Sequence, residues 1–150
     1  MSKQDLLTKL INDHEEVSEF LDNLREIMDF LHDKEAWDRI TPVEDFFKRK
    51  VIDHFEFEEK NIFPVCLLNL ASPELVKLIL ELQKDHGVIL TKTEDFLRRA
   101  TANIRSPNEE TTADLKLKGK EILDILLVHA SKEDDDLIPI IEKNKKIFSN

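Results

Sequence analysis

One motif occurs twice in this chain and limits what the chain can fold into. The first copy runs from His54 to Pro64 and the second from His129 to Pro139. Each copy has a His, a Glu four residues later, an acidic residue directly after that Glu, and a Pro that follows two apolar residues. Residues four apart lie on one face of an α-helix. We therefore expect two helices that each present an imidazole and a carboxylate on one face, an arrangement that can hold two metal ions when the helices face each other.

Apolar residues recur at spacings of three and four along four segments, which predicts four amphipathic helices. The first helix is expected to start after Ser2. The other three are expected to start at Ser/Thr-Pro pairs, where the hydroxyl caps the helix and the proline occupies its first position. These pairs are Thr41-Pro42, Ser72-Pro73 and Ser106-Pro107.

Short connections between the segments predict antiparallel neighbours, and hence an all-α, up-down-up-down four-helix bundle. A helix with one inward His followed by a helix with the His/Glu motif occurs twice, so an internal two-fold hairpin repeat is expected. Pro64 is expected to kink or end the second helix, with a short extension through Leu70 possible. The 150 residues are expected to form one domain, residues 1–150.

Composition excludes several classes of protein. A net charge of −10 argues against nucleic-acid binding, which needs clustered Lys and Arg, and an acidic surface attracts divalent cations instead. The sequence has no apolar run long enough to span a membrane and no recognisable signal peptide. Its single cysteine, Cys66, excludes an intramolecular disulfide and is expected to be a small buried hydrophobe. A cytoplasmic protein that binds neither membrane nor nucleic acid is the expectation.

His14 and His86 are the titratable residues on the apolar stripes of the first and third helices. One such His is usually a satisfied core residue. Four helices with one inward His each are a different case, because two of them also carry an inward Glu that is costly to bury unpaired. His32 lies about 27 Å along the helix axis from His14 and is excluded from a shared site. The predicted metal ligands are His14, His54, Glu58, His86, His129 and Glu133.

Other acidic residues adjoin these ligands in the sequence. Asp13, Asp53 and Asp85 each precede a predicted ligand. A residue one position earlier points about 100° away, so none of them easily reaches the imidazole beside it. They are expected to be solvated acids, although one could orient a His on a neighbouring helix. Glu59 and the run 134–136 are also expected to point off the inward face.

Four imidazoles and two carboxylates form a nitrogen- and oxygen-rich donor set that suits iron, with manganese or zinc less favoured. If both glutamates bridge, each ion receives two His and shares two carboxylates, which leaves open positions for a ligand. Dioxygen, nitric oxide, superoxide or peroxide would suit such a site. The sequence contains no recognisable nucleophile triad, phosphate-binding glycine loop or Cys-x-x-Cys.

The chain resembles the hemerythrin-like domains, also called HHE cation-binding domains. The resemblance covers nearly the whole chain and implies a hemerythrin-like bundle that holds two irons in an oxo- or hydroxo-bridged, non-haem di-iron centre, with the six residues above as ligands and the two glutamates as bridges. It rests on Asp13-His14, His54 through Pro64, Asp85-His86, and His129 through Pro139.

One position departs from the oxygen-carrying hemerythrins, which have a second His one turn after the ligand of the third helix. Leu90 stands there in this chain. The set of four His and two Glu is more similar to di-iron domains linked to nitric-oxide response and iron–sulfur repair. The expected function is a stand-alone di-iron protein that binds O2 or NO for sensing, scavenging or stress response. The alternatives are an oxidoreductase that reduces peroxide, O2 or NO with an external electron donor, or an iron-handling protein.

Overall fold

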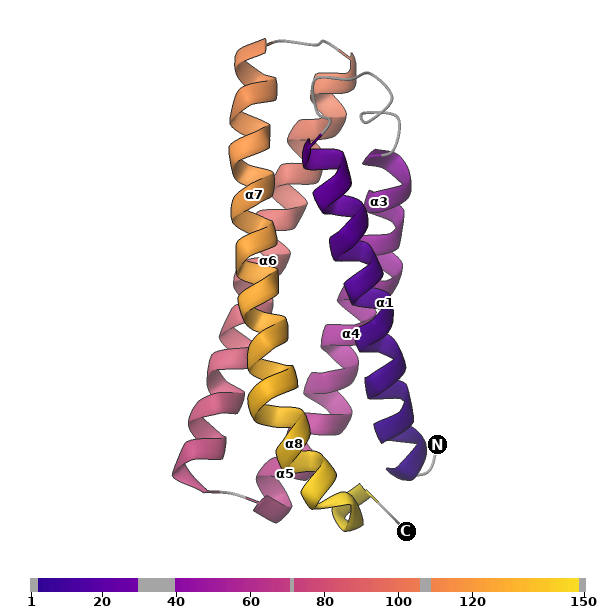
Figure 1. Ribbon diagram of the computed structural model, residues 1–150, viewed down its shortest axis with the longest axis vertical. Coiled ribbons are helices and arrows are strands. Elements are labelled where there is room, and N and C mark those ends of the chain that lie inside the picture. Colours follow the sequence, from indigo (N-terminus) through magenta and orange to yellow (C-terminus); the bar gives the residue numbers. More distant parts are fainter. Residues whose placement is uncertain (1–2, 30–39, 71, 106–108, 149–150) are drawn as a thin grey trace.

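The computed structural model describes residues 3–29, 40–70, 72–105 and 109–148. They form four long helical arms that lie side by side (Figure 1), and no β-strand occurs among them. The first arm is α1 (Lys3–Asp29) and the third is α6 (Pro73–Arg105). The second arm consists of α3 (Ile40–Phe46), η1 (Phe47–Val51), α4 (Ile52–Phe57), η2 (Glu58–Ile62) and α5 (Phe63–Leu70). The fourth consists of α7 (Glu109–Lys132), η3 (Glu133–Leu137), α8 (Ile138–Lys143) and η4 (Lys145–Phe148).

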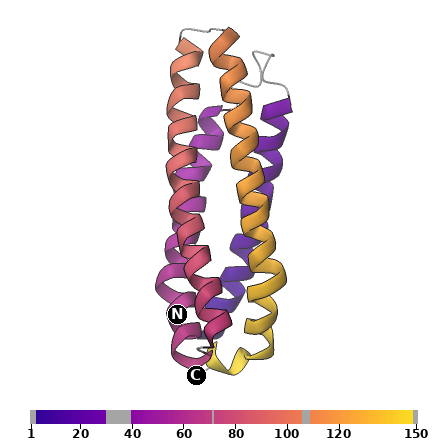
Figure 2. The same cartoon turned by 90° about the vertical axis from the view of Figure 1, so that its left-hand side faces the viewer.

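The arms form the predicted all-α, up-down-up-down four-helix bundle. Each arm packs against two neighbours: α1 against α3 and α7, and α6 against α3 and α7. The arms therefore close a ring in which neighbours in the chain are neighbours in space, as Figure 2 shows from the side. No helix in the described part of the chain is long and apolar enough to cross a membrane.

The predicted helix starts are confirmed only in part. The backbone N–H of Leu75 donates to the Ser72 hydroxyl at 3.2 Å, so the cap before Pro73 is confirmed. Helix α3 begins at Ile40, one residue before the predicted cap Thr41. The predicted starts at Ser2 and Ser106-Pro107 lie outside the described residues, as does His32.

Pro64 does not end the second arm, which continues to Leu70. The chain passes into the proline through η2, a π-helical turn in which the Phe63 N–H donates to the carbonyl of Glu58, five residues back. Proline has no N–H, and its ring clashes with the carbonyl four residues earlier in a regular helix, so a wider turn accommodates it. The fourth arm does the same before Pro139, where Ile138 donates to Glu133 through η3.

The apolar core consists of two clusters separated along the arms. One cluster includes Phe20, Phe47, Ile89 and Leu126, and the other includes Leu10, Ile62, Leu82 and Leu137. On three arms the predicted ligands fall between the residues that enter the two clusters, and on the second arm His54 and Glu58 flank the stretch in which the core residues change from one cluster to the other. The polar residues are therefore enclosed by apolar packing on both sides along the bundle axis.

Candidate metal centre

The structure brings all six predicted ligand residues together in the middle of the bundle. Their donor atoms form two groups, and within each group all the atoms lie within 4.8 Å of one another. Both groups contain Glu58 and Glu133; one adds His14 and His54, and the other adds His86 and His129. Two cations at these positions would each receive two imidazoles and share both carboxylates, which is the arrangement that the sequence predicts. Ligation itself stays a prediction.

The Nε2 atom of each imidazole faces the glutamates. His54 Nε2 is 3.1 Å from Glu58 Oε1, and its counterpart His129 Nε2 is 2.8 Å from Glu133 Oε1. Both pairs are four residues apart, so the predicted stacking on one helix face is confirmed. The single histidines of the other two arms also reach across: His14 Nε2 is 2.6 Å from Glu133 Oε2 and His86 Nε2 is 3.3 Å from Glu58 Oε1.

The Nδ1 atom of each imidazole faces an acid on a neighbouring arm. Where this contact is a hydrogen bond in which Nδ1–H donates, it leaves Nε2 unprotonated and free to bind a cation. Around the ring each arm supplies an acid to the next. The Nδ1-to-carboxylate distances are 3.5 Å for His54 to Asp13, 3.2 Å for His129 to Asp85, 3.1 Å for His14 to Asp134, and 3.5 Å for His86 to Glu59.

All of these acids were expected to lie off the inward face of their helices. Asp53 is exposed, as expected of a solvated acid, whereas both Asp13 and Asp85 contact a His on a neighbouring helix, where one such contact was expected at most. Asp134 and Glu59 lie off the inward face and are exposed, as predicted, but the prediction did not include the contact that each makes with a His on a neighbouring arm. A side chain turned about 100° from the inward face can contact a neighbouring arm while it also remains exposed to solvent.

Buried polar atoms test whether a metal fits these residues. Both carboxylate oxygens of Glu58, one of Glu133, and the Nε2 atoms of His14, His86 and His129 are buried, and although some of them lie close to one another, none makes a well-oriented hydrogen bond. Leaving such groups unsatisfied is costly, and cations between them would remove that cost. Nitrogen and carboxylate donors together suit iron, manganese or zinc. The residues therefore fit a metal centre.

The charges of the cluster are strongly coupled. Burial opposes protonation of His14, but the neighbouring carboxylates of Glu133 and Glu58 outweigh it and raise the His14 pKa to about 11. Burial likewise opposes protonation of His54 and His86, but Asp13 together with Glu58 raises the pKa of His54 to about 9, and Glu133 and Glu58 raise that of His86 to about 9. Burial also opposes ionisation of the two glutamates, yet the surrounding imidazoles hold the pKa of each below its ordinary value. Without a metal, protons on the imidazoles neutralise the carboxylates.

Aromatic rings cover one side of the cluster. The Phe55 ring stacks on His86 with centroids 3.9 Å apart, and Phe63 lies 5.8 Å from the same imidazole. Both rings occur in the first copy of the motif, but nothing in the sequence distinguishes them from ordinary core residues. The side chain of His14 is 14% exposed, compared with 2% for that of His86. The cluster is thus closed around His86 and more open around His14.

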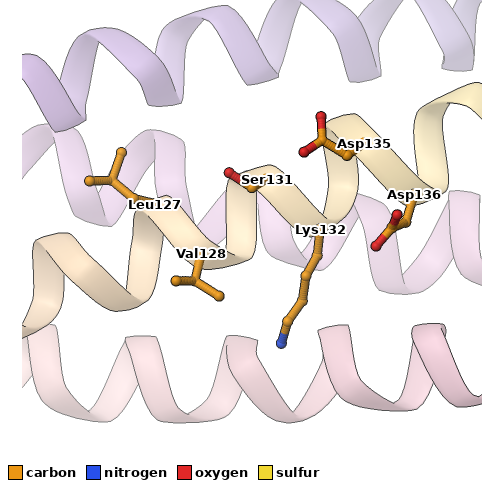
Figure 3. A pocket seen from close by; sticks show the side chains of 6 residues that line it. All are labelled: Leu127, Val128, Ser131, Lys132, Asp135 and Asp136. Atoms are coloured by element: carbon orange, nitrogen blue, oxygen red, sulfur yellow. The ribbon is translucent and has the colours of Figure 1, made fainter.

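A small cavity of about 20 Å³ lies on the open side, between α1 and α7. His14 and His54 line it together with His129 and Glu133. The remaining lining is mainly small or apolar: Val17, Ser18, Leu21, Phe55, Leu126 and Ala130, with Asp134. A larger groove of about 370 Å³ runs along the outer surface of α7 and η3 (Figure 3) and contains none of the predicted ligands.

Comparisons with known proteins support this assignment. The hemerythrin HHE cation binding domain matches the chain over residues 5–141. Neither the curated proteins nor the solved structures give a match. The matched range contains every residue of the cluster and nearly all of the bundle. The chain therefore belongs to the hemerythrin HHE cation-binding domain family.

Proposed function

We propose that this protein holds two iron ions and binds a small diatomic molecule, O2 or NO, in sensing, scavenging or stress response. The proposed ligands are His14, His54, Glu58, His86, His129 and Glu133, with the glutamates shared between the ions. Bound iron would supply redox-active open positions for such a molecule. The location in the cytoplasm stays a prediction from the sequence.

The cavity beside His14 and His54 is the observation that carries the choice of ligand. About 20 Å³ is room for one water-sized molecule and little more. Val17, Leu21 and Leu126 give it an apolar wall that favours an uncharged diatomic over a hydrated ion. A metabolite with several heavy atoms would have to displace these side chains to enter the position.

Residues of the chain have distinct tasks in this proposal. The acids at the Nδ1 atoms hold the imidazoles with Nε2 inward. Phe55 and Phe63 keep solvent from the His86 side. Ligand entry is therefore expected on the His14 side alone, where the Ser18 hydroxyl is available as a hydrogen-bond donor at the cavity wall.

A second candidate is an oxidoreductase that reduces peroxide, O2 or NO with an external electron donor. Its support is Asp134, which is 59% exposed and accepts a hydrogen bond from His14 Nδ1 at 3.1 Å. This contact connects the cluster directly to solvent on the side of the cavity. Turnover with a generic reductant under anaerobic control distinguishes this enzyme from a binding protein.

The test is iron analysis followed by ligand binding. Protein loaded with Fe(II) without oxygen should contain about two irons per chain and bind NO with a change in its absorption spectrum. Ala130→Val adds bulk to the cavity wall on α7 and should slow NO binding at least tenfold while iron content stays unchanged. Ala113→Val makes the same change at an exposed position of α7 and should have no effect. Less than one iron per chain, or equal NO binding rates in both variants, would contradict the proposal.

A further inference from the structure

Two lysines extend the contacts of the cluster outward in matching ways. Lys9 Nζ donates to Asp13 Oδ2 at 2.8 Å, and the same oxygen faces His54 Nδ1. Lys132 Nζ donates to Asp85 Oδ2 at 2.9 Å, and that oxygen accepts from His129 Nδ1. Each aspartate thus has one oxygen held between a lysine and an imidazole.

These contacts differ from ordinary surface ion pairs, which contribute little. The side chains of Asp13 and Asp85 are only 15% and 23% exposed. Lys132 bridges two arms, since it lies on α7 and Asp85 lies on α6. Figure 3 shows Lys132 directed toward the neighbouring helix and away from Asp135. Lys9 also lies 4.7 Å from the centre of the Phe57 ring, which further fixes its position.

The contact of a lysine with an aspartate and of that aspartate with an imidazole occurs at one imidazole in each half of the cluster. His54 belongs to one donor group and His129 to the other, and each has an aspartate with a lysine behind it. Their partners His14 and His86 instead face Asp134 and Glu59, whose side chains are 59% and 41% exposed. Within the described part of the chain, neither of those two acids has an ion pair with a lysine.

We propose that Lys9 and Lys132 are positioning residues of the metal centre, one for each ion. Each lysine holds its aspartate in place, and the aspartate fixes the imidazole with Nε2 directed at the ion. Each lysine also places a fixed positive charge near the centre, which disfavours the oxidised state of the metal because that state carries more positive charge. This inference rests on the proposed iron centre.

The experiment compares lysine variants in the iron-loaded protein. Lys132→Met and Lys9→Met remove the charge and keep the unbranched side chain. Each should speed the loss of iron to a chelator roughly tenfold, the low end of what outer partners of metal-binding His contribute. Each should also shift the midpoint potential of the centre to a lower value, which loss of packing alone would not do. Lys132→Arg keeps the charge and should restore both properties.

Lys118→Met is the matched control. Lys118 lies on α7, its side chain is 33% exposed against 30% for Lys132, and it pairs with Asp114, away from the cluster. It should leave iron loss and potential unchanged. The proposal is overturned if Lys9→Met and Lys132→Met behave like Lys118→Met.

The results distinguish a failure of the proposed iron centre from a failure of the positioning role of the two lysines. If the unmodified chain takes up little iron, the iron centre is wrong, and the same comparison is made with Co(II), whose release and absorption spectrum report the same ligands. Faster Co(II) release from Lys132→Met than from Lys118→Met then supports the positioning role alone. A chain that binds neither Fe(II) nor Co(II) contradicts both proposals.

Discussion

Phe63 donates its backbone N–H to the carbonyl of Glu58, five residues back, so the wide turn before Pro64 begins at a glutamate of the cluster. Glu133 and Ile138 have the same relationship before Pro139. π-helical turns are rare and occur mostly at functional sites. Here the proline explains the turn, and the turn lets the helix continue past the proline. The apolar residues beyond it can therefore join the second core cluster.

Glu58→Gln should lower the iron content from two toward one or fewer per chain. The amide keeps the size of the side chain but removes the charge that lets one carboxylate neutralise two cations. Glu58 is fully buried and faces three imidazoles, so no other group can replace it. Glu56→Gln, on the exposed side of the same arm, is the control. Metal analysis that finds two irons in both variants would refute bridging by Glu58.

The stability of the metal-free protein should depend on pH in a defined direction. The pKa of His14 is raised from 6.5 to about 11, and those of His54 and His86 to about 9. These groups contribute stability that is complete below pH 6.5 and is lost as the pH rises through 9 and then 11. The glutamates, whose pKa values are lowered from 4.5, contribute above pH 4.5 and lose that contribution as the pH falls.

The metal-free chain should therefore be most stable between about pH 4.5 and 6.5 and become less stable above that window. Metal binding must displace protons from the imidazoles, so the gain in melting temperature on adding metal should increase with pH over roughly pH 6 to 8.5. Thermal melts of both forms at several pH values test this. Parallel curves with and without metal would show that the imidazoles are not the metal ligands.

The grouping of the six predicted ligand residues could be predicted from the sequence because helix periodicity fixes which residues share a face. His54 and Glu58 are four residues apart, and this spacing survives because the π-helical turn begins only at Glu58. The contacts that Glu59 and Asp134 make with a neighbouring arm were not predictable. Whether a residue beside the inward face meets solvent or a neighbouring arm depends on how the helices are rotated in the bundle, and no single helix contains that information.

The two glycines offer a matched pair of stability tests. Gly87→Ala should stabilise the protein by roughly 0.5–1 kcal/mol, because alanine is the better helix former. A Cβ at Gly87 meets nothing within 4 Å. At Gly119 a Cβ would overlap the sulfur of Met28, whose side chain is buried between α1 and α7. Gly119→Ala should therefore destabilise by about 1–2 kcal/mol despite the same gain in helix propensity. Denaturant unfolding that gave both variants equal stability would contradict this close approach.

Leu90→His tests which ion takes the diatomic ligand. Position 90 is one turn after His86 on the regular helix α6, so an imidazole there lies on the same side of the helix. Leu90 is only partly buried, which makes the polar replacement tolerable. The added donor should fill an open position at the ion held by His86 and His129 and leave the cavity beside His14 unchanged.

We expect the Leu90→His protein to keep two irons and to bind NO as the unmodified protein does, because the ion beside the cavity keeps its open position. Leu90→Gln carries a similar packing cost without an imidazole and should behave like the unmodified protein. Iron analysis and NO titration of the three proteins give the answer. Complete loss of NO binding in Leu90→His alone would place the ligand at the His86 side, against the cavity. Two NO per chain in that variant would show that position 90 does not reach the ion.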